Sequence, residues 1–108
     1  MDDDAEHRAR LFWRLADALL IDPAVTTSRM MGFPCLRLGG RFFASLERST
    51  QRLVVKLPAG RVRELVVSGA ALPFAPNGRV FKEWAAVPSA DVAAWQRLMA
   101  EARDFARG

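Results

Sequence analysis

The sequence predicts a single two-layer α+β domain with a mainly antiparallel sheet of about five strands and helices packed on one face. Three observations predict this class. Segments with helical periodicity lie at both ends of the chain, alternating apolar and polar residues fill its middle, and 108 residues leave room for one hydrophobic core. The predicted order of elements is α-β-β-β-α-β-β-α, and the domain spans residues 1–108.

The first helix is predicted at residues 3–20, where apolar residues recur at spacings of three and four. One face carries Leu11, Phe12, Leu15, Ala18 and Leu19. Acidic residues stand at the start of this helix, where the helix dipole favours negative charge. Asp22 precedes Pro23 and is therefore driven out of the α region, which ends the helix.

Residues 35–38 and 41–46 are predicted to form a hairpin around Gly39-Gly40, because glycine tolerates the positive φ of a tight turn. A two-residue loop would mix apolar and polar side chains on each face. A three-residue loop with a bulge pairs Leu38 with Phe42 and separates them, so the hydrophobic pattern favours it. The predicted inward set is Leu36, Leu38, Phe42, Ala44 and Leu46, and the predicted outward set is Cys35, Arg37, Phe43 and Ser45.

A third strand is predicted at residues 52–57. It alternates between an inward set, Leu53, Val55 and Leu57, and an outward set, Arg52, Val54 and Lys56. Pro58 suits the first turn of a short helix, and Gly69 suits its C-terminal cap.

The C-terminal part is predicted to contain two strands and a helix. A strand at 79–87 pairs with a short one at 72–74, and Trp84 within it is assigned to the core. Ser89 is predicted to cap a helix at 90–106. The core stripe of that helix comprises Val92, Trp95, Leu98, Met99, Ala102 and Phe105.

Charge is unevenly distributed along the chain. Residues 29–82 carry eight Arg and two Lys against two Glu, which gives +8, whereas the flanking segments sum to −3 and −1. Arginine contacts phosphate and carboxylate in a bidentate manner, so the central block predicts an anionic partner, either DNA or an acidic protein. The alternative is that these arginines only solvate the surface of the sheet.

The candidate functional surface is the outward face of the hairpin and the third strand. We predict that Arg37, Arg41, Arg52 and Lys56 contact phosphate groups and that Phe43 packs beside them. The same face is compatible with a homodimer, with an adaptor for another protein, or with a solvated surface.

The sequence indicates no catalytic, cofactor or metal site. The single histidine, His7, lies in a charged helical turn without partners for a metal centre or a catalytic triad. Cys35 lies near Arg37 but has no base close in sequence, so we expect that the protein is not an enzyme. Apolar runs shorter than roughly 18 residues and an acidic N-terminal segment without a secretory signal predict a cytoplasmic protein without membrane association.

Four motifs, in order, resemble the TfoX/Sxy N-terminal domain family, to which the MmcQ/YjbR-like proteins are related. They are RMMG at 29–32, GGRFFA at 39–44, VKLP at 55–58 and KEW at 82–84. The family often has a single Phe where this chain has two. The resemblance implies an α+β domain with about five strands and a regulatory, DNA-associated role, and it supplies no catalytic residues.

Overall fold

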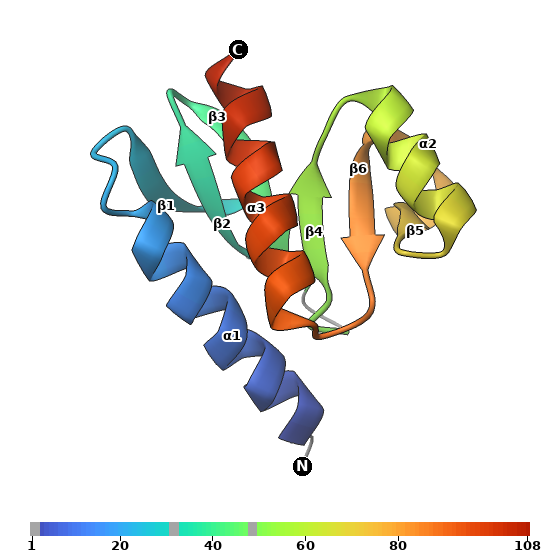
Figure 1. Ribbon diagram of the computed structural model, residues 1–108, viewed down its shortest axis with the longest axis horizontal. Coiled ribbons are helices and arrows are strands. Elements are labelled where there is room, and N and C mark those ends of the chain that lie inside the picture. Colours follow the sequence, from blue (N-terminus) through green and yellow to red (C-terminus); the bar gives the residue numbers. More distant parts are fainter. Residues whose placement is uncertain (1–2, 31–32, 48–49) are drawn as a thin grey trace.

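The computed structural model describes residues 3–30, 33–47 and 50–108, which form an antiparallel sheet of six strands and three α-helices (Figure 1). The strands lie in the order β1-β2-β3-β4-β6-β5. A short 3-10 turn, Pro76–Gly78, separates the last two strands. The elements are α1 (Asp3–Leu19), β1 (Val25–Met30), β2 (Phe33–Leu38), β3 (Arg41–Leu46), β4 (Leu53–Lys56), α2 (Ala59–Ser68), β5 (Leu72–Phe74), β6 (Phe81–Val87) and α3 (Val92–Arg107).

The predicted α+β class is confirmed, and the sheet has one strand more than expected. The additional strand is β1, which pairs with β2 in an unbroken register from Val25–Leu38 to Met30–Phe33. The neighbouring side chains of Thr26 and Thr27 in β1 are both exposed. This strand therefore lacks the alternation of apolar and polar residues by which a strand is recognised in a sequence. β-Branched residues nevertheless suit a strand at the edge of a sheet.

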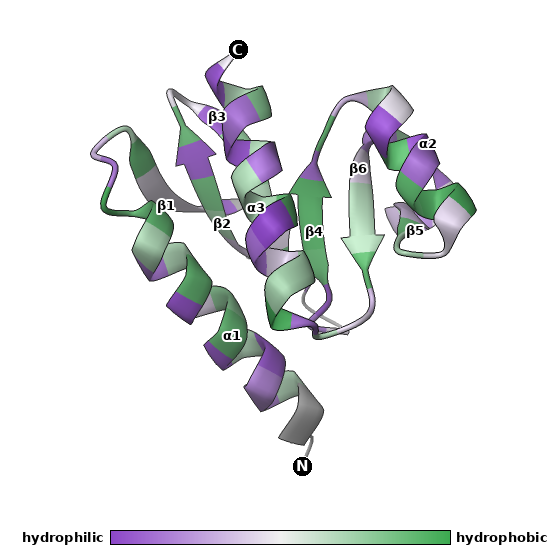
Figure 2. Ribbon diagram, in the orientation of Figure 1, coloured by the Kyte–Doolittle hydropathy of each residue, from purple (hydrophilic) through white to green (hydrophobic). Residues whose placement is uncertain are grey.

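The core lies between the sheet and the helices. Helix α3 packs on β2, β3 and β4, α1 packs on α3, and α2 covers β5 and β6. Figure 2 shows β4 hydrophobic along most of its length, whereas the helices alternate hydrophobic and hydrophilic bands. The largest fully buried side chains include Trp95 and Met99 of α3, Phe12 of α1 and Phe43 of β3.

The predicted cap is confirmed for α2 and is wrong for α3. Gly69 adopts the left-handed conformation, with φ +84°, and caps α2 as predicted. The predicted cap at Ser89 is wrong, because α3 begins at Val92 and the Asp91 carboxylate accepts a hydrogen bond from the Ala94 amide at 3.2 Å. The Ser89 carbonyl instead accepts a hydrogen bond from the Trp95 indole.

The predicted pairing of Leu38 with Phe42 at the turn of the β2–β3 hairpin is also wrong, whereas the pairing of Leu36 with Ala44 further from the turn agrees with the predicted register. Leu38 pairs with Arg41 across a two-residue turn, and Gly39 and Gly40 have φ values of +59° and +85°. Turns of this kind match the twist of the flanking strands. The extra residue is accommodated inside β3, where the register shifts next to the pair formed by Arg37 and Phe42.

This shift exchanges two aromatic side chains. Phe43 belongs to the buried core, whereas Phe42 shares the outer face with Arg37. The predicted inward positions of Leu36, Ala44 and Leu46 are confirmed, since all three belong to the core cluster. The bulge therefore lies in the strand rather than in the turn, and it turns the Phe43 side chain into the core.

Candidate anion-binding cleft

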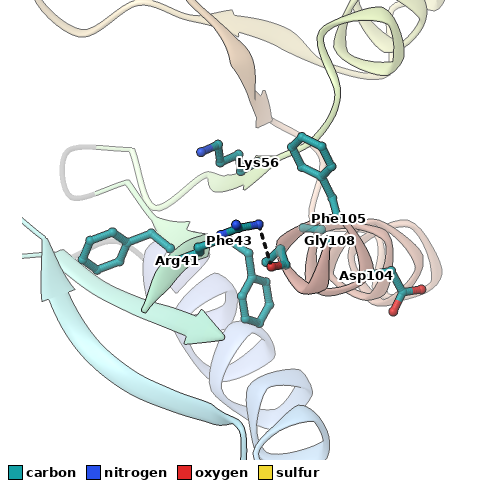
Figure 3. A pocket seen from close by; sticks show the side chains of 9 residues that line it. Arg41, Phe43, Lys56, Asp104, Phe105 and Gly108 are labelled. Atoms are coloured by element: carbon teal, nitrogen blue, oxygen red, sulfur yellow. Dashed lines mark hydrogen bonds between the residues drawn. The ribbon is translucent and has the colours of Figure 1, made fainter. Parts of the chain in front are cut away.

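The sheet opens between its two central strands. Regular pairing of β3 with β4 runs from Leu46–Leu53 to Ala44–Val55, and within the described residues it ends there. Beyond this point the start of β3 diverges from Lys56, which pairs with Trp84 of β6. The last turns of α3 contribute to the lining of the opening, and a cleft of about 600 Å³ results (Figure 3).

Two cations from different strands line this cleft. Arg41 begins β3, and its Nη1 donates to the Ala106 carbonyl oxygen of α3 at 3.4 Å. Lys56 ends β4 and forms no ion pair with any residue that the structure describes. Figure 3 shows Arg41 reaching toward the end of α3, with Lys56 and the Phe105 ring on the other side of the opening. The guanidinium keeps further N–H donors for a ligand.

The acidic residue of the cleft lining does not neutralise these cations. Asp104 Oδ1 lies 3.2 Å from Nη2 of Arg103, and Figure 3 shows its carboxylate pointing away from Arg41 and Lys56. A planar guanidinium and an ammonium group on either side of an opening suit a small anionic group such as phosphate or carboxylate. Phe105, half-buried, adds an apolar wall beside them.

The structure brings together three of the five predicted contact residues. Arg41, Phe43 and Lys56 all line the cleft. Phe43 is fully buried, however, so its predicted place on the outward face is wrong. The cause is the bulge in β3, which turns this side chain into the core.

The other two predicted residues do not line the cleft and are engaged within the chain. Arg37 lies over the Phe42 ring, 4.9 Å from its centroid, and its Nη2 donates to the Gly40 carbonyl oxygen at 3.2 Å. Arg52 donates from Nε to Glu47 Oε1 at 2.8 Å in the segment between β3 and β4. The predicted continuous row of basic side chains therefore divides into separate groups.

The sequence predicts that Phe105 belongs to the core stripe of the last helix, but in the structure it is only half-buried. The residue continues the apolar stripe of α3, but it falls beyond the point where β3 and β4 stay paired beneath the helix. The stripe is visible in the sequence, whereas the end of the β3–β4 pairing has no sequence signal. The cleft could therefore not be predicted from periodicity alone.

The residues considered for catalysis or metal binding lie away from this cleft. Cys35 is fully buried, and burial raises the pKa of its thiol while the nearby Arg37 lowers it to a smaller extent. A raised pKa disfavours the thiolate, which is the nucleophilic form. His7 is exposed on α1. The described part of the chain contains no group of three or more His, Cys, Asp or Glu residues that could hold a metal ion.

None of the helices in the described ranges is both long and apolar enough to cross a membrane. No protein-family model, curated protein or solved structure matches this chain. What the cleft binds is therefore inferred from its own residues.

Proposed function

We propose that this protein is a non-enzymatic interaction module that binds phosphate groups of a nucleic acid, with DNA as the first form to test. The observation that carries the proposal is that Arg41 and Lys56 line one cleft, while the Asp104 carboxylate in the same lining pairs with Arg103. The +8 charge of residues 29–82 favours attraction of a polyanion to this region. The motifs that resemble the TfoX/Sxy N-terminal domain support a regulatory role, in the cytoplasm of a bacterium.

The cleft also offers a surface beyond the phosphate site. Phe105 lines it next to the two cations, and an aromatic ring provides contact for a sugar or an unpaired base. Single-stranded DNA is therefore expected to bind at least as well as duplex DNA, since its bases are free to approach the ring.

The first prediction concerns the two cations of the cleft. In the double variant Arg41→Gln and Lys56→Gln, binding of a fluorescein-labelled oligonucleotide should weaken, and the slope of log Kd against log salt should fall by about two, one for each lost phosphate contact. Fluorescence polarisation at a series of salt concentrations measures both quantities.

The matched control removes the same charge elsewhere. Arg14 and Arg97 are exposed on α1 and α3, outside the cleft lining, and their double replacement by Gln should leave the slope close to that of the unchanged protein. Equal weakening of oligonucleotide binding in both double variants would show that overall charge, and not the cleft, determines the affinity. Absence of binding to single-stranded and duplex DNA at low salt would reject the nucleic-acid proposal and leave the adaptor or homodimer as the alternative.

A further inference from the structure

A second hollow lies between α2 and the β5–β6 edge of the sheet, and it shares no lining residue with the cleft. Its volume is about 310 Å³. Seven of its nine lining residues are apolar, and the remaining two are the cations Arg63 and Lys82. We refer to this hollow as the α2–β6 groove.

Apolar side chains near this groove are exposed to solvent. Phe81 and Val80, which line it, are 39% and 56% exposed. An exposed apolar cluster of this kind marks a surface whose burial by a partner is favourable. The groove therefore differs from the cleft, where charge dominates the chemistry.

The aromatic side chains of β5 and β6 pack against one another. The ring centroids of Phe74 and Phe81 are 6.1 Å apart, and those of Phe74 and Trp84 are 6.5 Å apart. The Arg79 guanidinium lies 5.8 Å from the Phe81 centroid. Because this ring already has Arg79 and Phe74 as neighbours, the site suits an inserted apolar side chain better than a stacked base.

The charged residues that line the groove are both basic. Arg63 and Lys82 line it and Arg79 stands beside Phe81, and none of the three forms an ion pair with a carboxylate in the described ranges. The nearest acids in sequence do not line the groove. Glu64 of α2 pairs with Arg61, and Glu83 follows Lys82 on β6.

We infer that the α2–β6 groove binds an acidic segment of a partner protein, whose apolar side chains enter between α2 and β6 while its carboxylates contact Arg63, Arg79 and Lys82. Charge complementarity selects this partner over a neutral or basic one. Addition of a strand to β5 is disfavoured, because that edge has three residues, includes Pro73 and has an irregular register. The partner segment therefore lies in the groove rather than extending the sheet.

The test is a selection of displayed random peptides against the whole protein, with the double variant Arg63→Glu and Lys82→Glu as counter-selection. Peptides that survive should place Asp or Glu around Leu, Phe or similar residues. Their measured affinity should fall by about tenfold or more in the charge-reversed variant, since two favourable pairs become repulsive. Phe81→Leu, which keeps an apolar side chain at the wall, should weaken binding less than Phe81→Ser.

Two controls separate this site from the cleft. Arg14→Glu with Arg97→Glu repeats the charge reversal outside the groove, and Arg41→Gln with Lys56→Gln removes the cations of the cleft. Both should bind the selected peptides within about twofold of the unchanged protein, because neither pair touches the groove.

Four outcomes would overturn the inference. Selected peptides without an excess of acidic residues, or with equal affinity for the charge-reversed variant, would remove it. Loss of oligonucleotide binding in that variant, without loss of peptide binding, would assign the groove to nucleic acid. A concentration-dependent dimer in light scattering that the variant abolishes would assign the surface to a second copy of this chain.

Discussion

Phe42 and Phe43 are adjacent and chemically identical, yet their environments are opposite. Phe43 is fully buried in the core, whereas Phe42 is half-exposed and packs against Arg37 on the outer face. The difference arises from the extra residue in β3, because a strand that continued its alternation would send them the other way. One inserted residue thus decides which ring contributes to the core.

This contrast leads to a prediction about stability. Phe43→Ala should lower the free energy of unfolding by about 3–5 kcal/mol, as expected for loss of a buried aromatic ring. Phe42→Ala should cost about 1 kcal/mol, because the ring is half-exposed and its contact with Arg37 is weak. Urea denaturation followed by circular dichroism measures both values. If Phe42→Ala lowered the free energy of unfolding more than Phe43→Ala, Phe42 would be the buried ring, and the described register would be contradicted.

Sequence alone could place most side chains of this hairpin but not these two. Leu36, Ala44 and Leu46 are apolar residues beside polar neighbours, so the hydrophobic pattern assigns them to a face. A Phe-Phe pair gives no such contrast, and either ring satisfies the pattern. The position of a bulge is a relation between two paired strands, and no local pattern encodes it.

At the scale of elements, the Gly39-Gly40 turn sets how β2 meets β3. Both residues have positive φ, and this conformation strains any residue with a Cβ. A Cβ at Gly40 would lie 3.7 Å from Nη2 of Arg37, which is ordinary van der Waals contact. The cost of a substitution there is therefore a backbone cost rather than a collision.

Gly40→Ala should destabilise the protein by about 1–2 kcal/mol, and Gly40→Asn should cost less because Asn tolerates the left-handed region. Gly60 in α2 serves as the opposite control, since a Cβ there meets nothing within 4 Å and its φ is not positive. Gly60→Ala should raise stability by up to about 1 kcal/mol. Thermal or urea unfolding distinguishes the two signs, and a stabilising Gly40→Ala would show that the turn differs from the one described.

The sequence predicted the helices and most strands because their signals are local. Apolar periodicity marks α1 and α3, and Gly69 marks the end of α2. β1 lacked such a signal because its exposed threonines stand at the edge of the sheet. The opening between β3 and β4 is a relation between two elements, and for that reason the candidate site appeared only with the structure.

At the scale of the whole molecule, internal ion pairs account for part of the central positive charge. Arg61 makes a bidentate contact with Glu101 at 2.9 and 3.1 Å, and this pair joins α2 to α3. The Glu101 hydrogen bonds raise the pKa of Arg61. Outside residues 29–82, Arg107 contacts Asp22 at 2.7 Å and ties the end of α3 to the segment after α1. A count of charges along the sequence therefore overstates the charge that remains for a partner.

Cys35 gives a prediction that concerns global unfolding. Its thiol is fully buried in β2, and burial raises its pKa above the ordinary value of 9.0. The unfolded thiol therefore ionises first as the pH rises, so this contribution to stability is present below pH 9.0 and is lost as the pH rises toward the folded pKa. Urea unfolding at a series of alkaline pH values should show a steeper loss of stability than in Cys35→Ala.

The same residue reports on exposure of the core. Labelling of Cys35 by a thiol reagent at neutral pH should proceed at the rate of unfolding, and Phe43→Ala should accelerate it far more than Phe42→Ala does. Rapid labelling of the folded protein would contradict the burial of Cys35. Identical pH slopes for the protein and Cys35→Ala would contradict the raised pKa.

The short β3–β4 pairing has a mechanical consequence. The pairs from Ala44–Val55 to Leu46–Leu53 join two halves of one continuous sheet, the plates β1-β2-β3 and β4-β6-β5, and α3 packs on both. Arg41 belongs to the first plate and Lys56 to the second, so an anion held between them acts as a clasp across the joint. Because a ligand that contacts both plates binds the folded protein and not the unfolded chain, it should raise the free energy of unfolding as its concentration rises.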